Sequence, residues 1–253
     1  MQRSLRRVFG PCRDEFPADA MTDPSARLAP FGGSLAASRL DVFERARTAL
    51  LALSPDETAS RTGACLRPGG VTVDFLGGTY DVDFARGVVR HLLSGPGAAD
   101  DLTVNTLILH YLLLADGSPL SGCNASYREF PGAQIYYGPF LARTVTPLVG
   151  AFGARSHVLL QAGERLGGRP VPLGDAAVVL DVFPRLPMTF VVWSGDDEVP
   201  ASGSVLFDGS AAGYLPLEDL VIAASLAVAA LRRAAPEAPP TAPTGGGGPC
   251  TRH

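Results

Sequence analysis

The stretch Gly174–Ala235 constrains the fold most, because it contains three apolar, β-branched runs followed by one long apolar helix pattern. The runs Ala176–Phe183, Met188–Trp193 and Gly203–Phe207 are bounded by Pro, Gly and Asp, which is typical of strands that end in turns. Pro216–Arg233 is apolar almost all round and ends in two arginines, so it predicts a buried helix packed on that sheet. This stretch therefore predicts the centre of the core.

A hairpin pattern lies earlier in the chain, in Val71–Ala85, where apolar and polar residues alternate on both sides of Gly77-Gly78. A two-residue hairpin turn requires positive φ, so this glycine pair is the predicted turn, and the acidic rows are predicted to face solvent. Strands cluster along the chain and do not alternate with helices. We therefore expect an α+β fold, in which the hairpin and the strands of Ala176–Phe207 form one antiparallel sheet with helices packed mainly on one face.

Helical periodicity divides the rest of the chain. Ser54-Pro55-Asp56-Glu57 predicts a helix start, and Pro147 is expected to kink the helix that contains it. The predicted helices are 38–53, 54–63, 102–115, 140–152 and 157–166, and an irregular loop is expected at 121–137. Residues 1–37 are predicted to be a poorly ordered N-terminal lead and 236–253 a disordered Pro- and Gly-rich tail, on either side of a single α+β domain at 38–235.

Composition excludes several classes of function. A net charge of −4 and a pI near 5.6 argue against nucleic-acid binding, and no apolar run reaches the roughly 20 residues that a membrane span requires. Cys12, Cys65, Cys123 and Cys250 show no C-x-x-C spacing, so we expect no cysteine-based metal site and free thiols in a reducing, cytoplasmic compartment. Phosphate-loop, nucleophile-elbow and zinc-protease motifs are absent from the sequence.

An ordered set of segments resembles a known family. GD-A-V-L, FPRLPMTFVVWSGDDEVP and VLFDGSAAGYLPLEDL follow VDFLGGTYDVDF, LILHYLL and YREFPGAQIYYGPF, and together they resemble the family catalogued as domain of unknown function 3786 over residues 40–235. The resemblance implies no established activity. Some members carry an N-terminal four-cysteine module similar to the iron–sulfur module of corrinoid proteins. The resemblance therefore implies a tetrapyrrole or corrinoid ligand, an iron–sulfur or corrinoid protein partner, and a setting in anaerobic redox or one-carbon metabolism. This chain departs from those members, because its N-terminal region contains one cysteine, Cys12.

His110 and Tyr111 are the first candidate ligand-binding residues, since they lie in the middle of an apolar helix. An imidazole in that position can serve as an axial ligand to a haem or cobalt. The alternative is a core histidine whose polar atoms are satisfied inside the protein, which is the usual state of buried polar groups.

The second group of candidates shares the expected loop: Tyr127, Arg128, Glu129, Tyr136 and Tyr137. Arginine offers bidentate donors to a carboxylate or phosphate, and tyrosine can stack on a planar ligand. Alternatively, Arg128 pairs with an internal acid and holds the loop in place.

Asp196-Asp197-Glu198 is expected to be a solvated hairpin tip, since cation sites need ligands that converge from several directions. Asp175 and Asp208 are expected to form turns at strand ends.

Three classes of function stay open on these residues. The chain is an accessory ligand-binding protein that uses the His110 helix and the Tyr127–Tyr137 loop, or an enzyme of unknown class that uses Arg128, Glu129 and His110, or a structural partner protein. The sequence identifies neither a reaction nor a cofactor.

Overall fold

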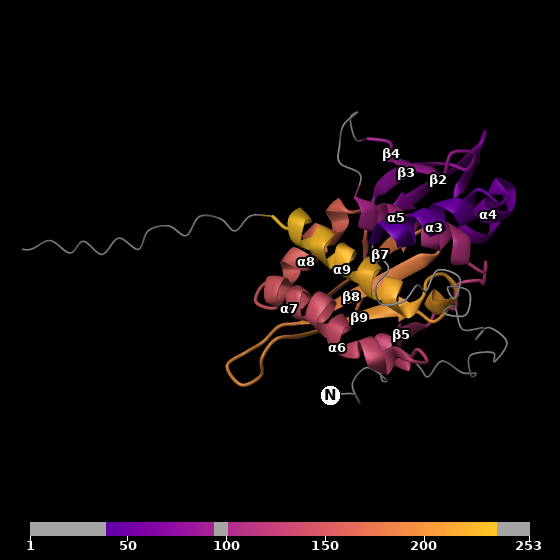
Figure 1. Cartoon of the computed structure of the whole chain (residues 1–253). Coiled ribbons are helices and arrows are strands. Elements are labelled where there is room, and N and C mark those ends of the chain that lie inside the picture. The colour runs from indigo at the N-terminus through magenta and orange to yellow at the C-terminus, as the bar shows by residue number, and fades with distance from the viewer. Residues whose placement is uncertain (1–38, 94–100, 237–253) are drawn as a thin grey trace, which may run out of the picture.

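The computed structural model describes residues 39–93 and 101–236, so the predicted N-terminal lead and most of the predicted tail lie outside the described residues. The described chain is an α+β protein with antiparallel sheets, which confirms the predicted class (Figure 1). Its strands, however, form two sheets rather than the single sheet expected from the sequence.

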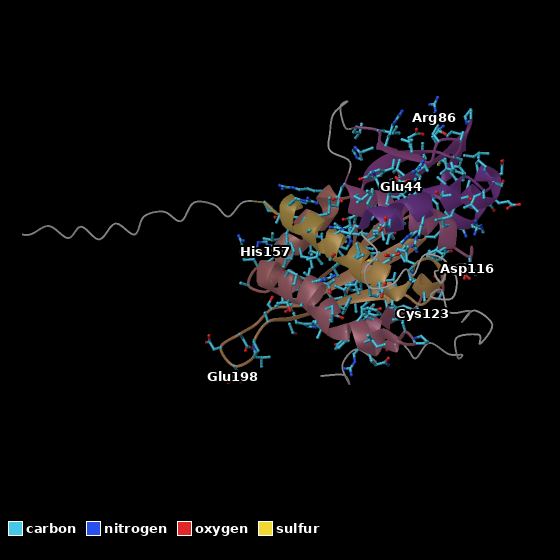
Figure 2. The ribbon with its side chains drawn as sticks, in the orientation of Figure 1. Glu44, Arg86, Asp116, Cys123, His157 and Glu198 are labelled. Carbon is cyan, nitrogen blue, oxygen red and sulfur yellow. The ribbon has the colours of Figure 1, made fainter. Side chains whose placement is uncertain are left out.

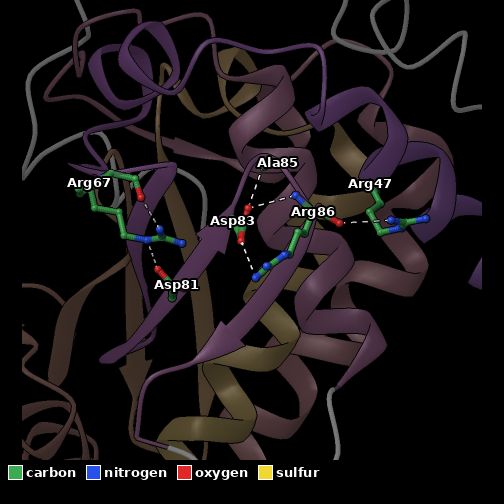
Figure 3. Close-up of polar contacts among 7 residues, drawn as sticks. Arg47, Arg67, Asp81, Asp83, Ala85 and Arg86 are labelled. Carbon is green, nitrogen blue, oxygen red and sulfur yellow. Dashed lines mark hydrogen bonds and ion pairs between the residues drawn. The ribbon is translucent and has the colours of Figure 1, made fainter.

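The first sheet has four strands in the order β1-β2-β3-β4. The strands are β1 (Cys65–Arg67), β2 (Gly70–Phe75), β3 (Gly78–Asp83) and β4 (Val88–His91). Val71, Val73 and Val82 are buried on its inner face, and Arg67 forms an ion pair with Asp81 on the outer face (Figure 3). The predicted alternation of apolar and polar residues is therefore confirmed.

The turn of the β2–β3 hairpin lies one residue earlier than predicted. Phe75 pairs with Gly78, which leaves Leu76 and Gly77 as the two turn residues, with φ of 48° and 78°. Gly78 is instead a strand residue, and a Cβ there would lie 2.7 Å from the His91 ring. The second glycine is needed for space and the first for positive φ, so the glycine pair alone did not define the turn.

The second sheet has five strands in the order β5-β9-β8-β7-β6. Its strands are β5 (Asn124–Ser126), β6 (Arg169–Pro170), β7 (Ala176–Phe183), β8 (Leu186–Trp193) and β9 (Ser202–Asp208). The three predicted strand runs are confirmed as β7, β8 and β9. Both sides of β7 are already paired, with β6 and β8, so the hairpin cannot pair with β7 as a further strand of this sheet. It touches β7 through one backbone hydrogen bond, from the Leu76 N–H to the Val182 carbonyl at 3.1 Å.

The helices fall into two groups. In the first, α3 (Arg39–Leu50) packs along α5 (Leu102–Leu114), and α4 (Pro55–Thr62) contacts β1 and β2. The second group consists of α6 (Tyr137–Phe140), a π-helical turn (Leu141–Val145), α7 (Thr146–Phe152), α8 (Ser156–Arg165) and α9 (Leu217–Ala234). It covers one face of the five-stranded sheet, as predicted, and α9 packs between α8 and the α6–α7 segment (Figure 1).

The helical segment 137–152 is irregular next to Pro147, where the sequence predicts a kink. Pro147 stands in the first turn of α7, directly after the π-helical turn Leu141–Val145. A proline lacks the N–H that continues an α-helical ladder, and a wider π turn before it absorbs the break. The segment therefore passes through Pro147 without ending there.

Two mid-helix glycines provide a matched test of how closely α8 lies on the sheet. A Cβ on Gly163 would lie 2.3 Å from a methyl group of Val178 on β7, whereas nothing lies within 4 Å of a Cβ on Gly150 in α7. We expect Gly163→Ala to lower the free energy of unfolding by about 1–3 kcal/mol through overpacking. Gly150→Ala should raise it by about 0.4–1 kcal/mol, because the unfolded chain loses freedom. Urea unfolding checks both, and a stabilised Gly163→Ala variant would contradict the close contact.

The hairpin turn gives a second prediction. Gly77 has open space around a Cβ, since its nearest neighbour would be the Leu166 carbonyl at 3.7 Å, so only its positive φ resists a side chain. We expect Gly77→Val to lower stability by about 1–3 kcal/mol. Thermal melting measures the change, and an unchanged melting temperature would place the turn elsewhere.

Candidate functional site

His110 lies on the buried side of α5, and its side chain reaches α9. Its Nδ1 is 2.7 Å from Oδ2 of Asp219 in the first turn of α9, and the two residues are 5% and 8% exposed. The Asp219 carboxylate accepts the Nδ1–H hydrogen bond, which fixes the orientation of the ring. The pair connects the helix group of the first sheet with that of the second. Asp219 belongs to no sequence motif, so only its contact with His110 in the structure identifies it.

Tyr111, the next residue, is fully buried and forms polar contacts in two directions. Its hydroxyl donates to the Thr62 carbonyl at 2.6 Å and accepts from the Arg185 N–H at 3.1 Å. Its ring stacks on Phe183 with centroids 4.1 Å apart. Burial raises the pKa of the Tyr111 phenol well above its ordinary value, so the hydroxyl stays a donor. In this structure Tyr111 ties α4, α5 and the β7–β8 turn together.

Tyr127 is also buried, and it holds the segment that carries Arg128. The Tyr127 hydroxyl donates to the Leu217 carbonyl at 3.1 Å, and its ring stacks on Phe140 at 4.4 Å. Burial raises the pKa of this phenol as well. The predicted irregular loop is therefore anchored at its first aromatic residue.

The segment 121–137 is more regular than predicted. It contains β5 and two 3₁₀ turns, Tyr127–Glu129 and Ala133–Tyr136. The Ser126 N–H donates to Oε2 of Glu129 at 2.9 Å, so this carboxylate caps the first 3₁₀ turn. Sequence periodicity missed these short elements because each is only three or four residues long.

Arg128, Tyr136 and Tyr137 reach the surface. The Arg128 guanidinium carbon lies 4.7 Å from the centroid of the Tyr137 ring, which is a cation–π contact, and Arg128 itself is exposed. The Tyr136 hydroxyl donates to Oε1 of Glu218, and this hydrogen bond raises the pKa of the phenol. Within the described residues, no carboxylate forms an ion pair with Arg128.

The first turn of α9, residues 217–219, receives three of the predicted site residues. His110 bonds to its third residue, Tyr136 to its second and Tyr127 to the carbonyl of its first. Carboxylates in a first turn also favour the helix dipole. The structure thus joins the two candidate groups at one helix end, through internal contacts, and leaves Arg128 and Tyr137 at the surface.

Asp208 forms a dense polar cluster. Its carboxylate accepts hydrogen bonds from the N–H groups of Ser121, Gly122 and Ser210 and from the hydroxyls of Ser121 and Ser210. Burial acts to raise the pKa of Asp208, but these hydrogen bonds outweigh it and lower the pKa. Asp208 closes the link between β9 and the start of β5, in line with the turn-forming role expected for it.

The described residues contain no group of three or more His, Cys, Asp or Glu side chains that could hold a metal ion. Glu198 sits at the tip of the projecting β8–β9 hairpin, away from the body (Figure 2). The backbone N–H groups of Glu198 and Val199 donate to Asp196, which makes the acidic run a turn.

Cys65 is a free thiol, but Cys123 is disulfide-bonded, so the expectation of free thiols is wrong for Cys123. Among the described helices, none is both long and apolar enough to cross a membrane.

Together these features define an α+β protein whose candidate site is a surface supported by buried aromatic and hydrogen-bond contacts. A family model described as "Domain of unknown function (DUF3786)" matches residues 54–230, and the chain belongs to this family. No curated protein and no solved structure matches the chain.

The buried hydroxyl of Tyr111 gives a test of this support. Tyr111→Phe keeps the stack on Phe183 but leaves the Thr62 carbonyl and the Arg185 N–H without their bonds, so we expect a loss of about 1–3 kcal/mol of stability. Tyr137→Phe is the matched control, since its ring is half-buried and none of the hydrogen bonds found in the described residues uses its hydroxyl. Urea unfolding compares the two, and equal effects would show that the Tyr111 hydroxyl does not tie the elements together.

Proposed function

We propose that this chain is a non-catalytic accessory protein that binds an anionic, planar ligand at the surface formed by Arg128 and Tyr137. The supporting observation is the exposed guanidinium held over the Tyr137 ring, with no carboxylate paired to it among the described residues. A guanidinium held in this way offers bidentate donors to a carboxylate or phosphate, and neighbouring aromatic rings offer a stacking surface. Tyr136 lies beside it in sequence and is half-buried.

The ligand class in this proposal is a tetrapyrrole or corrinoid that carries carboxylate or phosphate groups. Such a molecule combines a flat ring system with peripheral anions, which matches a tyrosine pair next to an arginine. The corresponding protein partner is an iron–sulfur or corrinoid protein of anaerobic redox or one-carbon metabolism, and the location is the cytoplasm. In this proposal His110 and Tyr127 position the surface from within, because both bond to the first turn of α9. Tyr111 holds α5, the helix that carries His110, against α4 and the β7–β8 turn.

Binding is favoured over catalysis by the state of the other charged candidates. The Glu129 carboxylate caps a 3₁₀ turn, and the His110 imidazole is bonded to Asp219 in the interior. An enzyme that uses Arg128, Glu129 and His110 would have to release two of these three groups from internal hydrogen bonds, which costs free energy.

Arg128→Ala tests the proposal with haemin and hydroxocobalamin as probes in absorption titrations. Without ligand, the variant should lose no more stability than an exposed cation–π contact contributes, about 0.5–1 kcal/mol. Its affinity for the bound probe should weaken by about 1.5–3 kcal/mol, the scale of a charge-assisted hydrogen bond. Arg143→Ala, which removes an exposed arginine from the neighbouring π-helical turn, should bind as the unmodified protein does.

Two outcomes would reject the proposal. The unmodified protein could bind neither probe, or Arg128→Ala could lower ligand-free stability strongly and leave binding intact. The second result would make Arg128 a residue that holds the 121–137 segment in place. Ile135 of the same segment, which is 80% exposed, would then favour a structural partner protein.

A further inference from the structure

The five-stranded sheet has a second face, opposite the helices, and the central part of this face is buried. Ala177 and Val191 are 0% exposed and Leu206 is 6% exposed, and with Leu173 they form a cluster separate from the main core. Within the described residues, the partly buried apolar side chains around this cluster are only Val171 and Trp193. These side chains are too few to form a layer that covers the face, so the described residues do not account for its burial.

The buried area extends beyond that cluster. Thr189 on β8 is 4% exposed, and it pairs with Val179 on β7 and Leu206 on β9. Residues that pair directly across antiparallel strands share a face, so the buried area spans three strands. The Thr189 hydroxyl donates to Oδ1 of Asn124 at 3.3 Å. This hydrogen bond satisfies the buried hydroxyl, but it does not explain why the apolar neighbours of Thr189 are buried.

The sequence restricts what can cover this face from within the chain. Residues 94–100 read SGPGAAD and residues 237–253 read EAPPTAPTGGGGPCTRH, and neither contains a Leu, Ile, Val, Met or aromatic residue. Residues 1–38 contain large apolar side chains, at Leu5, Val8, Phe9, Phe16, Met21, Leu28, Phe31 and Leu35. Apolar burial therefore favours the N-terminal segment over the other two.

Reach and connectivity agree with this choice. A chain of this length extends up to roughly 120 Å, several times the roughly 24 Å width of five paired strands. Cys123, which directly precedes β5 at the edge of this sheet, is disulfide-bonded, and Cys65 is free. The other cysteines of the chain are Cys12 and Cys250, so the candidates within this chain for the partner of Cys123 are one cysteine in each terminal segment.

We propose that residues 1–38 dock across the second face of the five-stranded sheet and complete its core over Val191, Thr189 and Leu206. This inference goes beyond the ligand-binding proposal and does not depend on it. It also replaces the expectation that the N-terminal residues form a poorly ordered lead. The apolar residues of 1–38 follow no helical or strand period. A segment that binds across a sheet in an extended conformation does not need one, because scattered apolar side chains are enough to contact the face.

Photo-crosslinking in the full chain tests this docking. Benzoylphenylalanine in place of Val179, which is half-buried on the second face, should crosslink within one chain to a peptide from residues 1–38. The same residue in place of Leu160, exposed on α8 over the other face, should not. Asp181, exposed on the same face as Val179, is the alternative position if the Val179 variant does not fold.

Mass spectrometry of the crosslinked peptides decides the result. A crosslink from Val179 or Asp181 to residues 237–253, a crosslink to a second copy of the chain, or no crosslink would overturn the proposal. Amide hydrogen exchange of the unmodified protein gives an independent measurement. Some amides within 1–38 should exchange at least about ten-fold more slowly than in an unstructured peptide, and uniform fast exchange would contradict docking.

Discussion

The hydroxyl group of Tyr111 is the contact on which the arrangement of the two sheets depends. It joins the end of α4, which leads into the first sheet, to the β7–β8 turn of the second sheet. The Tyr111 ring stacks on Phe183, and Phe183 in turn contacts Phe75 of the hairpin, with centroids 4.8 Å apart. A buried phenol without partners would cost free energy, so the two backbone groups that satisfy it also fix its position.

The same reasoning applies to the first turn of α9. His110 and Asp219 are buried polar groups whose desolvation is offset by their mutual hydrogen bond. Such a pair adds little to net stability but penalises any arrangement that separates α5 from α9. The Tyr127 hydroxyl donates to the Leu217 carbonyl in the same turn, so this hydrogen bond fixes the position of the residue before Arg128. The exposed arginine is therefore presented on a rigid support, which reduces the entropy that a ligand would have to overcome.

The two faces of the five-stranded sheet differ in how they are covered. On one face Gly163 and Gly168 allow α8 to lie close to Val178 and Leu180, with room for no further atom. On the other face Ala177, Val191 and Leu206 are also buried, but the described chain supplies only the 171–173 loop and Trp193 around the cluster. Antiparallel sheets can leave one face to solvent, and their outward residues are then polar. Val191 and Leu206 do not follow that pattern, which is why the second face requires a cover.

The sequence by itself determined the local elements. β-Branched runs between turn residues predicted β7, β8 and β9, and cap residues such as Ser54 and Pro55 predicted α4, because those preferences act between near neighbours. It also determined the α+β class and the family. Only the tertiary structure decided that the strands form two sheets, since the pairing partners of β7 are chosen by long-range contacts. It likewise decided that His110 meets Asp219, 109 residues away, and that Tyr127 is buried while Arg128 is exposed. These outcomes depend on which faces of distant elements pack together, and no local preference encodes that choice.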